Sequence, residues 1–96
     1  MDLSELLNQN RDQILDVVQK HGGQNVRIFG SVARGETGPD SDVDFLIDLE
    51  RGRSLLDRAS IKLELEKVLG CKVDVVTERG LRDRMRPRVL QEAVPL

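Results

Sequence analysis

A pair of carboxylates at the start of an apolar run constrains this chain more than any other feature. Asp42 and Asp44 stand two residues apart, directly before Phe45, Leu46 and Ile47. Alternate residues of a β-strand point to the same face of a sheet, so these two carboxylates are expected to lie side by side. Like charges held together against an apolar strand are unfavourable unless a cation lies between them. The pattern therefore predicts a strand whose first residues bind a hard divalent metal ion, for which carboxylate oxygens are suitable ligands.

A turn of small residues precedes this pair in the chain. An apolar run predicts a first strand over residues 25–29, and the run ends at Gly30 and Ser31. A short helical turn is expected over residues 32–34, and the first backbone N–H groups of such a turn are free to bind phosphate oxygens. Carboxylates with a metal ion, placed beside a Gly-Ser turn, indicate phosphate chemistry.

A third carboxylate, Asp74, interrupts the apolar run formed by Val73, Val75 and Val76. An unpaired charge inside such a run is costly, so its presence needs a reason. A sheet could bring Asp74 beside Asp42 and Asp44, and three carboxylates can share two metal ions. Two ions about 4 Å apart can clamp the attacking and leaving oxygens of an in-line displacement at phosphorus.

Apolar periodicity and chain breakers predict the remaining elements. A helix over residues 2–20 begins with a capping box at Asp2 and Glu5, and a longer helix begins at Ser54 and ends at Gly70. Further expected elements are strands over residues 43–49 and 71–76 and a last helix over 87–94. In the helix that begins at Ser54, the expected buried stripe consists of Leu55, Leu56, Ala59, Ile61, Leu65, Val68 and Leu69. The order of elements indicates an α+β fold, a two-layer arrangement in which a small mixed sheet carries helices mainly on one face.

Length and composition limit what the chain can do. Its 96 residues suit a single domain over 1–96, with 39% apolar and 33% charged residues. The net charge of −2 and the absence of Tyr and Trp argue against direct nucleic-acid binding, which uses basic surfaces and aromatic stacking. One cysteine excludes an internal disulfide and a cysteine zinc cluster. No apolar run is long enough to span a membrane, so a cytoplasmic protein without a membrane partner is expected.

Simpler readings exist for several of these residues. Gly30 and Ser31 alone could form a plain strand-to-helix turn, and Asp42 alone could be a cap or turn residue. Arg34 could lie on a solvated face or contact phosphate. Asp40, Asp42 and Asp44 at alternate positions also resemble a calcium loop, but Phe45 stands where that loop needs Gly and its final Glu is missing. The basic tail, which contains Arg79, Arg82, Arg84, Arg86 and Arg88, could be a solvated face or could reach a triphosphate or an acidic partner.

Together these motifs match a known family. The pattern Gly30-Ser31, Ala33-Arg34-Gly35, Ser41-Asp42-Val43-Asp44 and Val73-Asp74-Val75-Val76 resembles the minimal nucleotidyltransferases (MNT) of the DNA polymerase beta-like superfamily. The resemblance covers almost the whole chain, including residues 90–96, and it implies the strand order of the nucleotidyltransferase fold. The position after Ser31 is often Arg in relatives and is Val32 here, whereas Arg34 is kept.

The resemblance implies roles for the matching residues. Gly30, Ser31 and Arg34 would bind the triphosphate of a nucleotide, and Ser41 would bind the nucleotide or brace its loop. Asp42, Asp44 and Asp74 would hold two Mg²⁺ ions. Asp74 would also act as general base for the incoming hydroxyl, which attacks the α-phosphate of ATP while pyrophosphate leaves.

The resemblance also implies a partner. Minimal nucleotidyltransferases similar to this chain act as antitoxins paired with a ribonuclease toxin of the HEPN group. The implied reaction is transfer of AMP from ATP to a hydroxyl of that toxin, with tyrosine as the expected acceptor. Two alternatives stay open: a non-catalytic antitoxin that neutralises the toxin by binding, and nucleotidyl transfer to a small molecule or an RNA end.

Overall fold

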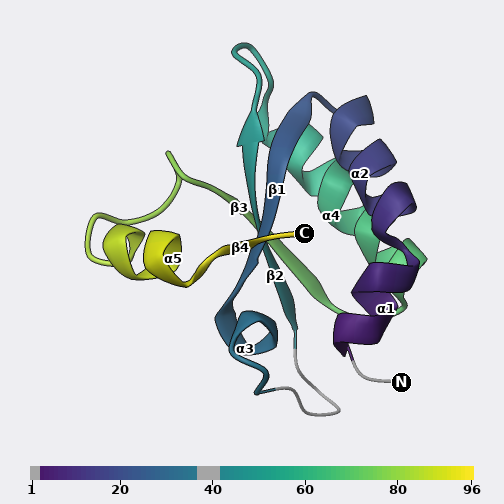
Figure 1. Cartoon of the computed structure of the whole chain (residues 1–96). Coiled ribbons are helices and arrows are strands. Elements are labelled where there is room, and N and C mark those ends of the chain that lie inside the picture. The colour runs from purple at the N-terminus through teal and green to yellow at the C-terminus, as the bar shows by residue number, and fades with distance from the viewer. Residues whose placement is uncertain (1–2, 37–41) are drawn as a thin grey trace.

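The computed structural model describes residues 3–36 and 42–96, and a mixed sheet forms the centre of the molecule (Figure 1). The sheet contains β1 (Gly23–Phe29), β2 (Val43–Leu49), β3 (Val73–Thr77) and β4 (Val94–Pro95), in the spatial order β3-β2-β1-β4. β1 is antiparallel to both β2 and β4, whereas β2 and β3 are parallel.

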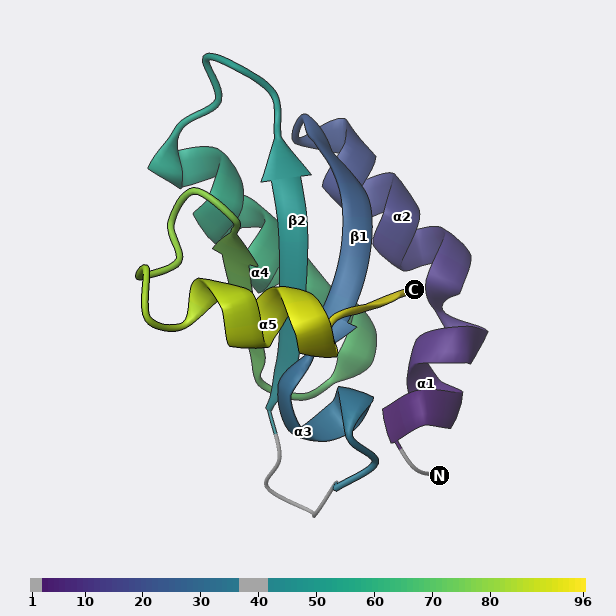
Figure 2. The same cartoon turned by 60° about the vertical axis from the view of Figure 1, so that its left-hand side comes forward.

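The helices cover the two faces of this sheet unequally. α1 (Leu3–Gln9), α2 (Arg11–Lys20) and α4 (Leu55–Leu69) lie on one face, and α5 (Arg86–Glu92) lies across the other (Figure 2). The short α3 (Gly30–Ala33) follows β1 directly at one end of the sheet. The predicted α+β fold, with helices mainly on one face, is therefore confirmed.

The alternation of side chains along β2 explains the two layers. Val43, Phe45 and Ile47 are fully buried in the larger core, which they share with residues of α2 and α4. Leu46 points to the opposite face and packs with Leu81 and with Val89 of α5 in a second, smaller cluster. Because Asp44 and Asp48 have the same parity as Leu46, they lie on the α5 face of the sheet.

Local signals set the bounds of the best-predicted elements. β2 spans residues 43–49 as expected. α4 begins with the predicted capping box, in which the Ser54 hydroxyl accepts a hydrogen bond from the Leu56 N–H and Asp57 accepts one from the Ser54 N–H. It ends at Gly70, whose φ of 68° is the left-handed conformation that favours glycine.

Several predicted bounds were wrong. The expected helix over residues 2–20 is broken at Asn10, where the side-chain amide donates to the Leu6 carbonyl and so competes with the helical hydrogen bonds. The first strand starts earlier, at Gly23, and the third is shifted to residues 73–77. The last helix ends at Glu92 because the chain then pairs with β1 as β4, a two-residue strand too short to leave a pattern. Asp2, part of the expected capping box at the N-terminus, lies outside the described residues.

The predicted buried stripe of α4 was also wrong in its first turns. Leu55 and Leu56 are 68% and 77% exposed, and Ala59 is exposed as well. The later part of the prediction is confirmed, since Ile61, Leu65 and Leu69 are buried. The helix therefore has apolar side chains on two sides, and packing against the sheet and α2 decides which side is covered.

Across residues 3–36 and 42–96, the structure has no helix that is long and apolar enough to cross a bilayer.

Candidate active site

Carboxylates from two neighbouring strands meet at the end of the sheet where β1 finishes. Asp44 of β2 is the direct partner of Asp74 in β3, and Asp42 immediately precedes β2. Directly paired residues of adjacent strands project their side chains on the same face. The structure therefore brings together the three carboxylates that the sequence singled out.

Asp44 is the most perturbed member of this group. It is half-buried, and its pKa is raised to about 6, first by burial and then by the negative charges of Asp74 and Asp42. Within the described residues, none of the three carboxylates makes a hydrogen bond or an ion pair. The site thus holds negative charge that no side chain of the described residues neutralises by direct pairing.

Gly30 is required beside these carboxylates for two reasons. Its φ of 75° lies in the left-handed region, and a Cβ at this position would stand 2.2 Å from Oδ2 of Asp44. Ser31 follows in α3 and is half-buried, and its hydroxyl makes no hydrogen bond within the described residues. Val32, at the position that is often Arg in relatives, is buried in the core and anchors α3.

Arg34 lies near the carboxylates but is held by two other acids. Its Nε is 3.1 Å from Oε2 of Glu36, and its Nη1 donates to Oε1 of Glu92. These hydrogen bonds, that of Glu92 first, raise the pKa of Arg34. The positive charge of Arg34 also acts to lower the pKa of Asp44.

Glu92 is a site residue that the sequence reasoning missed. It lies at the end of α5, 58 residues from Arg34 in the chain, and no local motif marks it. The Arg34 guanidinium, together with the backbone N–H of Gly30 in a smaller part, lowers the pKa of Glu92. A carboxylate therefore lies against both groups that were expected to bind phosphate.

The carboxylate oxygens of this site are the type of ligand that magnesium ions bind. Mg²⁺ prefers carboxylate oxygens, and the uncompensated charge around Asp44 would be neutralised by a cation. However, no group of three or more Asp, Glu, His or Cys side chains within residues 3–36 and 42–96 is placed to hold a metal ion as it stands. Asp40 and Ser41, which belong to the predicted motif, lie outside the described residues, so the Ser41 assignment remains a prediction.

Comparisons with known proteins agree with this geometry. The model of the nucleotidyltransferase domain family matches residues 11–96. A Methanocaldococcus jannaschii protein, provisionally named a protein adenylyltransferase, is 42% identical over 88 residues, which are 92% of this chain and 95% of that protein. Protein adenylyltransferase MntA of Thermococcus cleftensis is 40% identical over 76 residues, 79% of this chain and 77% of that protein.

Solved structures share the fold. One, provisionally described as a minimal nucleotidyltransferase, superposes with a TM-score of 0.88 at 54% identity and covers 100% of this chain and 97% of its own. A toxin-antitoxin structure with AMP-PNP matches with a TM-score of 0.77 and covers 90% of this chain and 71% of its own. At 20% identity, this second likeness concerns the fold alone.

Proposed function

Because this chain belongs to the nucleotidyltransferase domain family, we propose that it is a protein adenylyltransferase that transfers AMP from ATP to a hydroxyl of a partner protein. One observation supports the proposal most strongly. Asp44, paired with Asp74 across β2 and β3, is half-buried, lacks a cation partner in the described structure and carries a pKa raised to about 6. Carboxylates kept in this state are typical of functional sites rather than of structural ion pairs.

The residues around Gly30 would receive the nucleotide. The turn at Gly30 and Ser31 offers backbone N–H groups, and the Arg34 guanidinium can pair with phosphate oxygens as it now pairs with Glu92. Asp42, Asp44 and Asp74 would hold two Mg²⁺ ions, which when bound would neutralise phosphate charge during the displacement. Ser41 would contact the nucleotide from the preceding loop.

The reaction proposed is an in-line displacement at the α-phosphorus of ATP. Asp74 accepts the proton of the acceptor hydroxyl, whose oxygen forms a bond to the α-phosphorus. The bond from the α-phosphorus to the bridging oxygen breaks, and pyrophosphate leaves with both electrons of that bond. Asp74 is exposed, as is Asp42, which leaves its carboxylate open to contact with an incoming acceptor.

For the acceptor we propose a tyrosine hydroxyl on a HEPN-type ribonuclease toxin, which the transfer would silence. The names of the relatives support protein adenylylation in general. The chain would act in the cytoplasm, where it would meet both ATP and its partner.

Mass spectrometry of the partner tests the proposal. The protein encoded beside this chain is incubated with the chain, ATP and Mg²⁺, and we expect a gain of AMP on one of its tyrosines. Asp42→Asn should abolish the gain, whereas Asp16→Asn, an exposed carboxylate on α2, should leave it unchanged. No gain with the unmodified chain would refute protein adenylylation. An equal gain of AMP with Asp42→Asn would refute the assignment of the active site to these carboxylates. Full neutralisation of the toxin by a double variant, Asp42→Asn with Asp44→Asn, would favour the non-catalytic alternative.

A further inference from the structure

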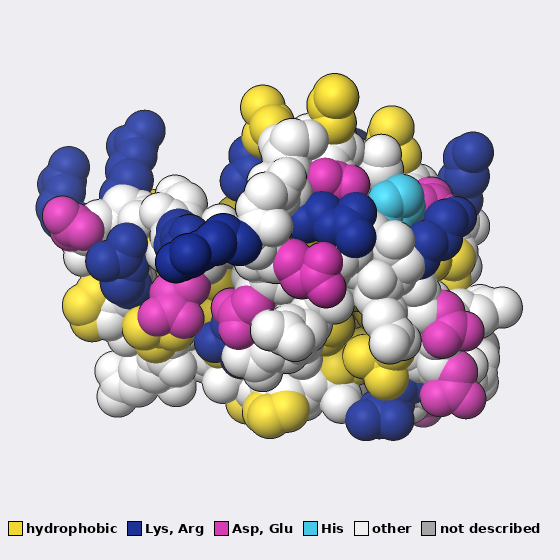
Figure 3. Space-filling view, turned by 90° about the horizontal axis from the view of Figure 1, so that it is seen from above, with side chains coloured by type: hydrophobic (Ala, Val, Ile, Leu, Met, Phe, Trp, Pro, Cys, Tyr) yellow, Lys and Arg dark blue, Asp and Glu magenta, His cyan; other side chains and the backbone are white. Residues whose placement is uncertain are grey.

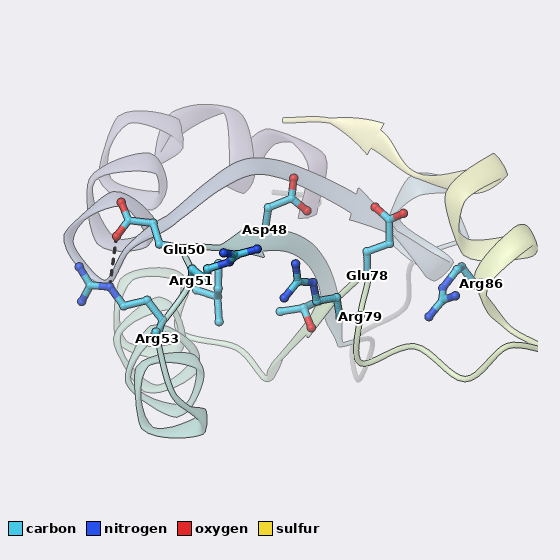
Figure 4. Close-up of a pocket in the computed structure, with 10 residues that line it drawn as sticks. Asp48, Glu50, Arg51, Arg53, Glu78, Arg79 and Arg86 are labelled. Carbon is cyan, nitrogen blue, oxygen red and sulfur yellow. Dashed lines mark hydrogen bonds and ion pairs between the residues drawn. The ribbon is translucent and has the colours of Figure 1, made fainter.

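A polar groove lies at the opposite end of β2 and β3 from the carboxylates (Figure 4). It encloses about 590 Å³ between the end of β2, the 50–53 loop, the segment after β3 and the start of α5. Four arginines line it: Arg51, Arg53, Arg79 and Arg86. None of them belongs to the candidate active site.

Two of these arginines have no ion pair in the described structure, although Asp48, Glu50 and Glu78 also line the groove. Arg51 and Arg79 make no hydrogen bond or ion pair within the described residues, and Figure 4 shows both reaching into the middle of the groove from different loops. Arg53, in contrast, is 3.4 Å from Glu50 and 3.6 Å from Asp57. The centre of the groove is therefore suited to bind carboxylates from another molecule.

An apolar stripe begins directly after the arginine loop. Leu55, Leu56 and Leu63 of α4 are 68%, 77% and 59% exposed, and Ala59 lies between them. At about 100° per residue, these four side chains fall within one third of the helix circumference, and the centre of this sector lies roughly 130° around the helix from the centre of the buried stripe. Viewed from this end, hydrophobic side chains gather along one edge beside a band of mixed charge (Figure 3).

The groove and the stripe are neighbours in space as well as in sequence. Arg53 lines the groove and lies 3.6 Å from Asp57 in the first turn of α4, and Leu55 follows Arg53 by two residues. An exposed apolar stripe rimmed by unpaired cations is typical of a protein interaction site.

We propose that the arginine groove and the leucine stripe form one docking surface for the acceptor protein, which would present an acidic helix with an apolar side. The inference rests on the proposed function for the identity of this partner. Exposed leucines do not suit RNA, and the chain has no Tyr or Trp for base stacking.

A docking surface at this end of the sheet would bind the partner at a distance from the candidate active site. Asp44 and Asp48 lie on the same face of β2, four residues and about 13 Å apart, with α5 packed on Leu46 between them. Losing the docking contacts should therefore raise the KM for the acceptor protein and leave ATP binding and kcat unchanged.

Binding measurements with charge-reversed variants test this surface. The purified chain is titrated with the protein encoded beside it, at low and at high salt, by calorimetry. Arg51→Glu with Arg79→Glu should weaken binding about tenfold or more, as should Leu56→Ser with Leu63→Ser. Arg82→Glu with Arg84→Glu is the matched control, because these exposed arginines lie outside the groove, and it should change binding less than about twofold.

Each other outcome has a defined meaning. Unchanged partner binding in both groove and stripe variants would overturn the docking surface, even if AMP transfer is observed. Dimerisation of the chain that the leucine variants abolish would assign the surface to a second copy, and binding of polyadenylate that only the groove variants lose would assign it to RNA. If the groove and stripe variants no longer bind the partner while the unmodified chain transfers no AMP, the docking surface is supported and the proposed AMP transfer is refuted.

Discussion

Asp44 and Asp48 have the same side chain, the same strand and the same face of the sheet, yet they lie in opposite electrostatic environments. Asp48 accepts hydrogen bonds from Arg27, at 3.1 Å, and from Asn25, at 3.0 Å. Asp44 has no such partner in the described structure and faces two further carboxylates, which together with burial raise its pKa to about 6.

This difference separates a structural acid from a candidate functional one. A carboxylate that serves only the fold is stabilised where it stands, as Asp48 is by Arg27. Asp44 is kept uncompensated, an arrangement that lowers stability unless something outside the chain supplies positive charge. The end of the sheet that contains Asp44 is therefore the end at which a ligand is expected.

The largest effect should come from exchanging the two acids for amides in turn. Asp44→Asn removes a proposed metal ligand and should lower AMP transfer about a thousandfold, or roughly 4 kcal/mol in transition-state stabilisation. Asp48→Asn should lower transfer less than about threefold, because its side chain serves the fold. Rates of AMP incorporation into the acceptor protein check both values. Similar losses of AMP transfer in the two variants would show that Asp44 and Asp48 do not differ in function.

The next largest effect concerns the glycine that faces Asp44. Gly30→Ala should destabilise the protein by about 2 to 4 kcal/mol, because the new Cβ would be 2.2 Å from Oδ2 of Asp44 at a φ of 75°. Gly35→Ala is the matched control: its φ is 73°, but no atom of residues 3–36 and 42–96 lies within 4 Å of the added Cβ, so it should cost only about 1 kcal/mol. Urea denaturation measures both, and equal losses would show that backbone strain alone is responsible.

The raised pKa of Asp44 predicts a pH dependence in protein freed of metal by a chelator. The pKa of Asp44 is about 6 in the folded protein against 3.8 for a free aspartate side chain, so the folded state keeps the proton of Asp44 to higher pH than the unfolded state does. The stability that this proton contributes is therefore lost as pH rises through 6. At pH 7.5 Asp44→Asn should be more stable than the unmodified chain, by about 1 kcal/mol after allowance for solvent screening. Below about pH 3.5 the two should be equally stable.

Denaturation curves across this pH range, with and without Mg²⁺, measure the effect. Added Mg²⁺ should stabilise the unmodified chain and reverse the order of the two variants at pH 7.5. If Asp44→Asn is still more stable than the unmodified chain at low pH, packing rather than charge causes the difference in stability.

The smallest effect is expected at the structural acid. Arg27→Met should cost about 1 kcal/mol, because the Arg27 side chain is largely buried and its pair with Asp48 is partly exposed. AMP transfer should be unchanged. A loss of activity without a loss of stability would show that the Asp48 end of the strand also takes part in the chemistry.

Much of the fold near the site was predictable because its signals are local. Alternation of Asp42, Val43, Asp44 and Phe45 located β2 and its two faces, and the Ser54 cap with Gly70 located α4. Gly30 was identified as a turn residue, although its closeness to Asp44 was not foreseen.

Other features depend on residues that are distant in the chain. Glu92 reaches Arg34 only because α5 crosses the sheet and returns to β1 as β4. α4 has apolar residues on two sides, so its own sequence does not determine whether Leu56 or Leu65 is buried.

The sequence by itself determined the strand with its paired carboxylates, the glycine turn before it and the class of the fold, because each follows from backbone geometry and side-chain spacing within a few residues. Only the tertiary structure decided which acids lack a cation, which side of α4 faces solvent and how two unpaired arginines come to share one groove. Charge compensation and burial are properties of the space around a residue, and that space is filled by segments far away in the chain.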